Sequence, residues 1–196
     1  MLQEKSTISL LRHGQPQGGE IFRGTTDNLL TSTGWQQMLA AVEAMDTIDI
    51  VLSSPLHRCF DFARYLARQR AIEMKVIPAL QEIDFGQWEG RLINSIADEE
   101  KQRFWKNPVK YPPPGGESYV DFQQRIMAFW SDLLTCYQGK NCLLITHGGV
   151  QKTLLSAILK TPIEAIHNIE IGYACCSIFN VYYYGEECIV TLKAHG

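Results

Sequence analysis

Three short stretches of the chain place arginine and histidine where predicted strands end. They are "LLRHG" (10–14), "SSPLHR" (53–58) and "THGG" (146–149). A phosphoryl group carries about two negative charges near neutral pH, and the planar, permanently charged arginine is its best clamp. We therefore predict that Arg12 and Arg58 bind a small phosphorylated metabolite.

The histidines of these stretches suggest nucleophilic catalysis. His13 and His147 each stand directly before glycine, and at Gly148 the backbone can approach a ligand closely. A neutral imidazole can attack phosphorus and hold the group covalently, which splits one difficult step into two easier ones. Because Arg12 and Arg58 disfavour imidazolium, the attacking nitrogen of one histidine stays free. The other histidine would stabilise the equatorial oxygens of the phosphoryl group.

A leaving alkoxide also needs a proton, and Glu82 is the best candidate donor. It is expected in a loop beside Phe85 and Trp88, and apolar neighbours and a bound phosphate both raise the pKa of a carboxyl group. Asp84 and Glu89 lie close by and are the alternatives. Nothing in this scheme requires a metal or a cofactor, so none is expected.

Alternating strands and helices are expected to position these residues. Pro55 suits the first turn of one helix, and Thr31 or Ser32 can cap another. Strands are predicted at 7–13, 48–54, 75–80, 141–147, 175–184 and 188–195, and helices at 30–45, 55–69, 117–137 and 148–160. This order indicates an α/β three-layer sandwich with a mostly parallel central sheet flanked by helices. Ligands of such sheets bind beyond the carboxyl ends of the strands.

Residues 81–118 interrupt this alternation with a loop, a charged helix and a Pro/Gly-rich turn. We expect a single domain over 1–196, in which 81–118 forms a lid-like excursion over the active face. The tryptophans of the chain are expected mostly in the core or the lid, and Trp105 is the one to test as a substrate contact.

Composition narrows the class of partner. The 196 residues are 45% hydrophobic and 20% charged, with a net charge of −3, which gives no support for nucleic acid or an anionic membrane as partner. No signal peptide and no stretch able to cross a bilayer are recognised, so a cytoplasmic protein is expected. The six cysteines contain no C-x-x-C and read as reduced thiols. The sequence leaves the oligomeric state open.

Four motifs, taken in their order along the chain, resemble those of a known superfamily. "LLRHG", "SSPLHRCFDFA", "QEIDFGQWEG" and "LLITHGG" resemble, over nearly the whole chain, the histidine phosphatase (phosphoglycerate mutase-like) superfamily. The resemblance implies the phosphoglycerate mutase-like fold and makes His13 the phosphorylated nucleophile. It also implies that Arg12, Arg58 and His147 complete the phosphate pocket and that Glu82 is the proton donor.

Three further stretches, less specific than the four motifs, are similar to the α-ribazole phosphatases of cobalamin biosynthesis. They are "GGEIFRGTTDNLLTSTGWQQM" (18–38), Cys59 with Phe62, and "FWKNPVKYPPPGGES" (104–118). They imply hydrolysis of α-ribazole 5′-phosphate, or of its corrinoid-linked form.

One stretch departs from the superfamily pattern. Many relatives carry Glu-Thr or Glu-Ser after the first motif and an Asn a few residues later, whereas here "QPQGG" (15–19) follows and no Asn appears before Asn28. We expect backbone N–H groups around Gly18 and Gly19, helped by Arg23, to replace that phosphate contact.

Other functions remain open beside hydrolysis. A phosphoglycerate mutase would use the same phosphohistidine and return the phosphate to a second hydroxyl, but mutase relatives tend to be longer. A broad-specificity sugar phosphatase is a further alternative, and a protein phosphohistidine phosphatase would need wider access than 81–118 should allow. Outside enzymes, the chain could be an inactive phosphate-ligand sensor, although an inactive copy has no need of Glu82. His57, His167 and His195 are expected at the surface, outside the site.

Overall fold

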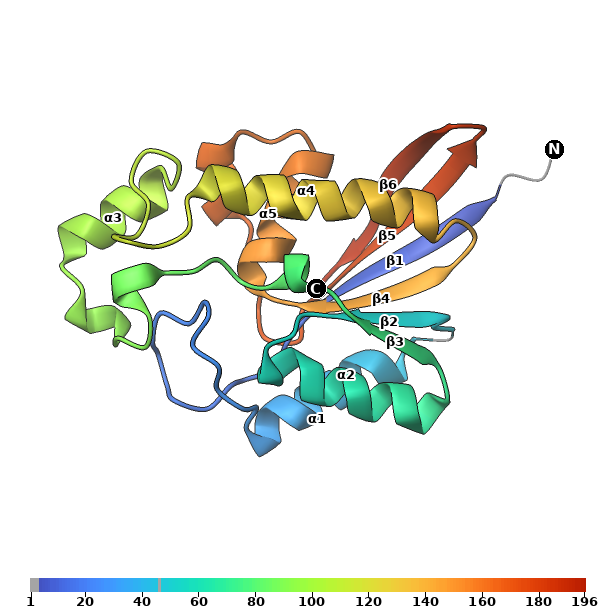
Figure 1. The fold of residues 1–196 in the computed structure, drawn as a ribbon, viewed down its shortest axis with the longest axis horizontal. Coiled ribbons are helices and arrows are strands. Elements are labelled where there is room, and N and C mark those ends of the chain that lie inside the picture. Colours follow the sequence, from blue (N-terminus) through green and yellow to red (C-terminus); the bar gives the residue numbers. More distant parts are fainter. Residues whose placement is uncertain (1–3, 46) are drawn as a thin grey trace.

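One six-stranded sheet forms the centre of the molecule, as Figure 1 shows. The computed structural model describes residues 4–45 and 47–196. The strand order is β3-β2-β4-β1-β5-β6; β5 is antiparallel to both of its neighbours, and the other pairs are parallel. The strands are β1 (Lys5–Arg12), β2 (Ile50–Ser53), β3 (Glu73–Val76), β4 (Asn141–Thr146), β5 (Cys176–Tyr184) and β6 (Glu187–His195). The predicted mostly parallel sheet is confirmed.

Helices cover both faces of this sheet. They are α1 (Ser32–Glu43), α2 (His57–Arg70), α3 (Asp98–Lys106), α4 (Tyr119–Cys136) and α5 (Gly148–Ile158). In Figure 1, α1 and α2 lie on one side of the strands and α4 and α5 on the other. The predicted three-layer sandwich is therefore correct.

Alternation along the central strands explains how both faces are buried. In β4, Cys142 and Leu144 pack into the cluster beneath α4 and α5, whereas Leu143 and Ile145 pack into the cluster with α1 and α2. Successive side chains of a strand point to opposite faces, so a continuous apolar run is needed when both faces are covered. That covering holds the carboxyl ends of β1 and β4 in fixed positions.

Several predicted ends of helices and strands were wrong by one or more residues, and two of these errors involve proline. Helix α2 begins at His57 with Leu56 as its N-cap, so Pro55 precedes the first turn instead of lying in it. The strand predicted at 75–80 is β3, which ends at Val76, and a short 3₁₀ helix at Pro78–Leu80 follows. Proline lacks the N–H that a strand ladder needs, which favours ending the strand before it. Elsewhere, Thr31 caps α1 as one of the two predicted residues.

The segment 81–118 forms a small body of its own beyond the strand ends. It contains 3₁₀ turns at Gly86–Trp88 and Ile93–Ser95 and the charged helix α3. Trp88, Ile96 and Phe104 bury a separate apolar cluster together with Phe22. In Figure 1 this body lies at the opposite end of the sheet from the start of β1, and so beside the ends of β1 and β4.

The remaining sequence expectations concern the last two strands, the cysteines and the membrane. The strands predicted at 175–184 and 188–195 are β5 and β6, which form a hairpin around Gly185, whose φ of 68° suits glycine. All six cysteines are free thiols. Within 4–45 and 47–196, every helix is too short or too polar to cross a membrane.

Candidate active site

The ends of β1 and β4 bring the two candidate histidines together. Arg12 at the end of β1 lies opposite Thr146 at the end of β4, and the backbone N–H of His13 donates to the Thr146 carbonyl at 2.9 Å. The rings of His13 and His147 follow directly, with centroids 5.2 Å apart and planes inclined by 63°. Parallel neighbours in a sheet therefore place residues 134 positions apart in contact.

His13 is held as a neutral imidazole. Its Nδ1 lies 2.8 Å from the carbonyl oxygen of Gly14, which can only accept, so Nδ1 carries the proton and Nε2 keeps its lone pair. Burial lowers the pKa of His13 well below its usual value, and the charges of Arg58 and Arg12 lower the pKa further. The whole residue is only 5% exposed. A neutral ring nitrogen is the form that can attack phosphorus.

Arg12 reaches from the end of β1 toward the segment before β5. Its Nη1 donates to the carbonyl of Ile171, and its guanidinium lies over the ring of Tyr173, 4.4 Å from the centroid. Its Nε is buried and has no protein partner. No ion pair among the described residues involves this arginine, so its charge is available to an anion.

Arg58 lies in the first turn of α2 and is fully buried. Its Nη2 donates to the Gly24 carbonyl at 2.7 Å, and its Nη1 donates to the Thr26 carbonyl at 2.9 Å. Its Nε donates to Nδ1 of His147 at 3.2 Å. Burial lowers the pKa of Arg58. A buried guanidinium whose acceptors are all uncharged keeps a positive field that favours an anion nearby.

His147 has protein partners on both ring nitrogens. Because the Nε of Arg58 can only donate, Nδ1 of His147 accepts, and Nε2 donates to the Ser54 hydroxyl at 2.8 Å. Burial and Arg58 hold the pKa of His147 well below its usual value. In this arrangement the ring orients Arg58; to reach a phosphoryl oxygen it would have to release one of these hydrogen bonds.

Glu82 presents a carboxyl group to the same site. Its Oε1 accepts from the N–H of Ile83 at 3.0 Å, and its Oε2 accepts from the N–H of Gly149 at 2.9 Å. Burial raises the pKa of Glu82, although these two hydrogen bonds and the charges of Arg58 and Arg12 oppose the rise. A carboxyl group with a raised pKa keeps a proton to higher pH, which suits a general acid.

The two alternative carboxylates are occupied elsewhere. The carboxylate of Glu89 accepts backbone N–H groups of Gly24, Thr25 and Thr26 on one side and of Phe85 on the other. This carboxylate therefore holds the loop whose carbonyl groups bind Arg58. Asp84 Oδ1 accepts the N–H of residue 86 at 2.7 Å and shapes its own turn.

The loop after β1 contains Gly19 and Arg23, which were predicted to help bind the phosphate. Gly18 and Gly19 have φ values of 92° and 71°, which glycine adopts readily. Arg23 donates to the carbonyl groups of Gln17 and Gly19 at 2.7 and 3.0 Å and to Oδ1 of Asn28 at 2.8 Å. Arg23 thus fixes the loop, and burial lowers its pKa.

Two cavities meet at Arg12, Glu82, Phe85 and Trp105. The first, of about 430 Å³, contains the nucleophile candidate His13 and is also lined by Gly19, Arg23 and Tyr173. The second, of about 210 Å³, is lined by Gly148, Gly149, Phe104, Lys152 and His167, among others. Arg58 and His147 line neither cavity, because they are buried behind the cavity wall. The first cavity therefore holds His13 together with Arg12 and Arg23, and the second is lined by aromatic side chains and Lys152.

Histidines outside the pair fall in two groups. His57 is exposed and pairs with Asp61 at 3.1 Å, in a separate groove of about 550 Å³ along α2, and His195 is exposed too. The surface prediction for His167 was wrong: it is half-buried in the second cavity, with an Nε2 that has no partner, and burial lowers its pKa to about 4. Among the described residues, no three His, Cys, Asp or Glu side chains are placed to hold a metal ion.

Several residues of the site escaped the sequence analysis. Ser54 and Gly149 lie inside two of the quoted motifs, and that position was the only available signal. A Cβ on Gly149 would lie 2.2 Å from Oε1 of Glu82, so any larger residue there would displace the Glu82 carboxyl group. Tyr173 and Lys152 carry no motif, and only the folded chain places them near Arg12.

Comparisons with known proteins identify the family of the chain. Residues 8–193 match the histidine phosphatase superfamily (branch 1). The chain is 33% identical over 96% of its length to the bifunctional protein Rv2228c of Mycobacterium tuberculosis, and it spans about half (54%) of that relative. It is 31% identical to the putative phosphoserine phosphatase 2 of Hydrogenobacter thermophilus, over 92% of this chain and 91% of that one. The corresponding identity to the adenosylcobalamin/alpha-ribazole phosphatase of Escherichia coli is 28%, over 88% of each.

A solved structure shows the same architecture. Mycobacterial glucosyl-3-phosphoglycerate phosphatase Rv2419c superposes with a TM-score of 0.84 at 26% identity, over 97% of this chain and 98% of that one. The family match over residues 8–193 includes the motifs that contribute His13, Arg58, Glu82 and His147. The chain therefore belongs to branch 1 of the histidine phosphatase superfamily.

Proposed function

We propose that the protein hydrolyses small phosphomonoesters through a covalent phosphohistidine on His13. One observation carries the proposal: His13 is held neutral, with Nε2 as the lone-pair nitrogen, beside Arg12 and Arg58. No described carboxylate forms an ion pair with either guanidinium, so the two can supply the positive charge without a metal ion.

The first step transfers the phosphoryl group to the protein. The lone pair on Nε2 of His13 forms the N–P bond while the bond from phosphorus to the leaving oxygen breaks. The carboxyl proton of Glu82 passes to that oxygen, so an alcohol leaves instead of an alkoxide. Arg12 at the cavity and Arg58 behind it stabilise the charge on the equatorial oxygens.

The second step returns the protein to its starting state. Water attacks phosphorus, the carboxylate of Glu82 accepts a proton from that water, and the N–P bond breaks. Inorganic phosphate is released, His13 is again neutral and Glu82 is again protonated. Each group thus ends the cycle as it began.

The preferred substrate in this proposal is α-ribazole 5′-phosphate, or its corrinoid-linked form. The similarity of 18–38 and 104–118 to α-ribazole phosphatases supports this choice, as does the named activity of the Escherichia coli relative. The second cavity also fits a leaving group that carries an aromatic base, because Phe85, Phe104 and Trp105 line it. In the same proposal, 81–118 is a lid within the single domain and contributes these aromatic side chains.

A substrate panel tests the choice. We expect kcat/KM to be higher for α-ribazole 5′-phosphate than for ribose 5-phosphate, phosphoserine or 3-phosphoglycerate. Trp105→Ala should lower kcat/KM for α-ribazole 5′-phosphate more than for ribose 5-phosphate. Equal values across the panel would instead support a broad-specificity sugar phosphatase.

A second candidate is a phosphoglycerate mutase, and Lys152 favours it. This half-buried ammonium group lines the second cavity, and among the described residues no carboxylate lies within ion-pair distance of it. Burial and Arg12 lower its pKa. The carboxylate of a phosphoglycerate would neutralise it. If 3-phosphoglycerate is isomerised when a bisphosphoglycerate primer is added, the mutase is correct; phosphate release alone supports hydrolysis.

A further inference from the structure

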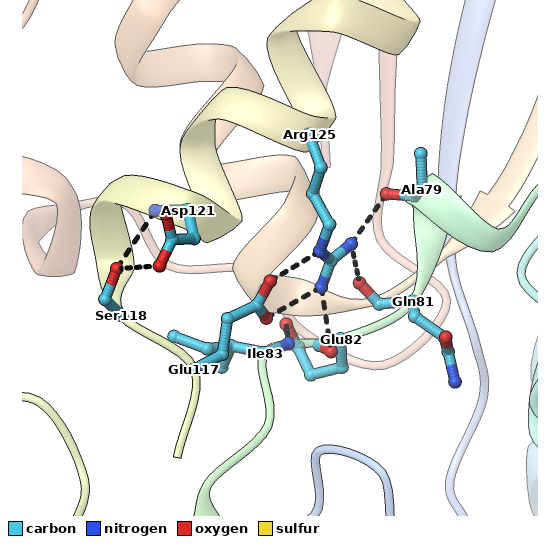
Figure 2. A network of polar contacts seen from close by, with 8 residues as sticks. All are labelled: Ala79, Gln81, Glu82, Ile83, Glu117, Ser118, Asp121 and Arg125. Atoms are coloured by element: carbon cyan, nitrogen blue, oxygen red, sulfur yellow. Dashed lines mark hydrogen bonds and ion pairs between the residues drawn. The ribbon is translucent and has the colours of Figure 1, made fainter. Parts of the chain in front are cut away.

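An arginine and a glutamate outside the site hold the chain segment that carries Glu82. Arg125 lies on α4 and Glu117 just before it, and Figure 2 shows both side chains beside residues 79–82. The Arg125 Nε and Nη2 donate to the two oxygens of Glu117 at 2.7 and 2.9 Å. This is the bidentate pairing that fixes the plane of a guanidinium.

The other N–H groups of Arg125 point to the backbone of that segment. Nη1 donates to the carbonyl groups of Ala79 and Gln81 at 2.8 and 2.9 Å, and Nη2 donates to the carbonyl of Glu82 at 3.2 Å. With the two bonds to Glu117, five hydrogen bonds match the five N–H donors of one guanidinium. The arginine therefore has no donor to spare for a ligand.

The segment has little regular structure of its own to hold it. The 3₁₀ helix ends at Leu80, and Gln81 has an extended conformation (φ −60°, ψ 150°). The Leu80 carbonyl accepts the Thr146 hydroxyl at 2.9 Å, so the four carbonyl groups of 79–82 all accept from side chains of α4 or β4. The direction of the Glu82 side chain depends on these bonds, because they set its backbone.

We propose that the Arg125–Glu117 pair is a positioning device for the general acid, and this rests on the proposed role of Glu82. The pair holds the Glu82 backbone where its carboxyl group meets the N–H of Gly149. The side chains of Arg125 and Glu117 are 27% and 20% exposed, and Arg125 also packs over Phe122. Neither side chain contacts the cavity that holds His13.

Two substrates separate this role from a purely structural one. An alkyl phosphate such as ribose 5-phosphate needs its leaving oxygen protonated, whereas p-nitrophenyl phosphate releases a stable phenolate without that help. A misplaced general acid therefore lowers the ratio of kcat/KM for the alkyl ester to that for the aryl ester. A general loss of folded protein lowers both values equally and leaves the ratio unchanged.

We expect Arg125→Met to lower this ratio about 10- to 100-fold, the range that a displacement of roughly 1 Å can cost. Arg125→Lys should restore the ratio only in part, because an ammonium group cannot make the planar fork. Glu117→Gln should lower the ratio in the same direction with little change in chain packing, and it tests the proposal if Arg125→Met fails to fold.

Arg70→Met is the matched control. Arg70 on α2 also donates to backbone carbonyl groups, those of Val42 and Met45, at 2.6 and 3.2 Å, but it lies away from Glu82. It should lower the melting temperature and leave the ratio unchanged. An unchanged ratio in both Arg125→Met and Glu117→Gln would overturn the positioning role, provided that Glu82→Gln lowers it. If Glu82→Gln itself leaves the ratio unchanged, the acid assignment fails instead.

Discussion

Replacing Glu89 by glutamine should weaken the phosphate site without changing any cavity residue. Its Oε1 accepts the N–H groups of Gly24, Thr25 and Phe85 at 2.9–3.0 Å. Its Oε2 accepts two N–H groups, that of Thr26 at 2.9 Å and that of Gly24 at 3.2 Å. Glutamine keeps one acceptor oxygen and places an NH₂ group where the other stood. The NH₂ group would then face backbone N–H groups. Because both are donors, no hydrogen bond can form between them.

The number of hydrogen bonds lost sets the expected loss of folding stability. If two hydrogen bonds to the charged carboxylate are lost, at about 1.5 kcal/mol each, folding is destabilised by roughly 3 kcal/mol. For a domain of this size that corresponds to a fall in melting temperature of about 6–12 °C. The freed loop carries the Gly24 and Thr26 carbonyl groups that hold Arg58, so we expect kcat/KM to fall about tenfold.

Kinetics and melting temperatures on one set of proteins test this reasoning. Arg58 acts on the phosphoryl group, so Glu89→Gln should lower kcat/KM equally for p-nitrophenyl phosphate and ribose 5-phosphate and weaken inhibition by inorganic phosphate. The control is Glu73→Gln, an exposed carboxylate 3.3 Å from Lys75 on β3, which should change none of these values. Normal phosphate inhibition in a destabilised Glu89→Gln protein would refute the link from this carboxylate to Arg58.

Three further predictions follow from the site. Because the pKa of His13 is lowered and that of Glu82 is raised, kcat/KM for alkyl phosphates should persist below the usual histidine range and fall as rising pH deprotonates Glu82. A pH profile that rises through pH 6–7 would contradict the lowered pKa of His13, and a fall within the usual glutamate range would contradict the raised pKa of Glu82. Gly149→Ala should reduce alkyl phosphate turnover more than p-nitrophenyl phosphate turnover, because its Cβ would lie 2.2 Å from Oε1 of Glu82, and equal losses would argue against this displacement. Lys152→Met should raise KM for 3-phosphoglycerate and not for ribose 5-phosphate; equal KM changes would remove Lys152 from carboxylate recognition.

The part of the site that follows sheet geometry could be predicted from the sequence. Apolar runs before "RHG" and "THGG" identify two buried strands, and parallel neighbours bring residues at their ends together. This is why the contact between His13 and His147 could be expected before the fold was known. The alternating burial along β4 follows from the same period of two.

The part that depends on loops could not be predicted. The residue types alone left Glu89 open as an alternative to Glu82. Only the folded backbone shows that Glu89 accepts four backbone N–H groups while Glu82 accepts two. The Arg125 network needs α4 to lie beside 79–82, a contact between segments more than 40 positions apart with no periodic signal. The surface prediction for His167 failed for the same reason, because this side chain is covered by Phe104 and Trp105 of α3, far from it in the sequence.

Direct detection of the phosphorylated residue tests the central claim. Protein mixed with a substrate that carries labelled phosphate and quenched in base should hold acid-labile label, located by mass spectrometry to the peptide that contains His13. His13→Ala should lose both label and turnover while its melting temperature stays near that of the unaltered protein. Label retained by His13→Ala, or found on another residue of the unaltered protein, would contradict the account.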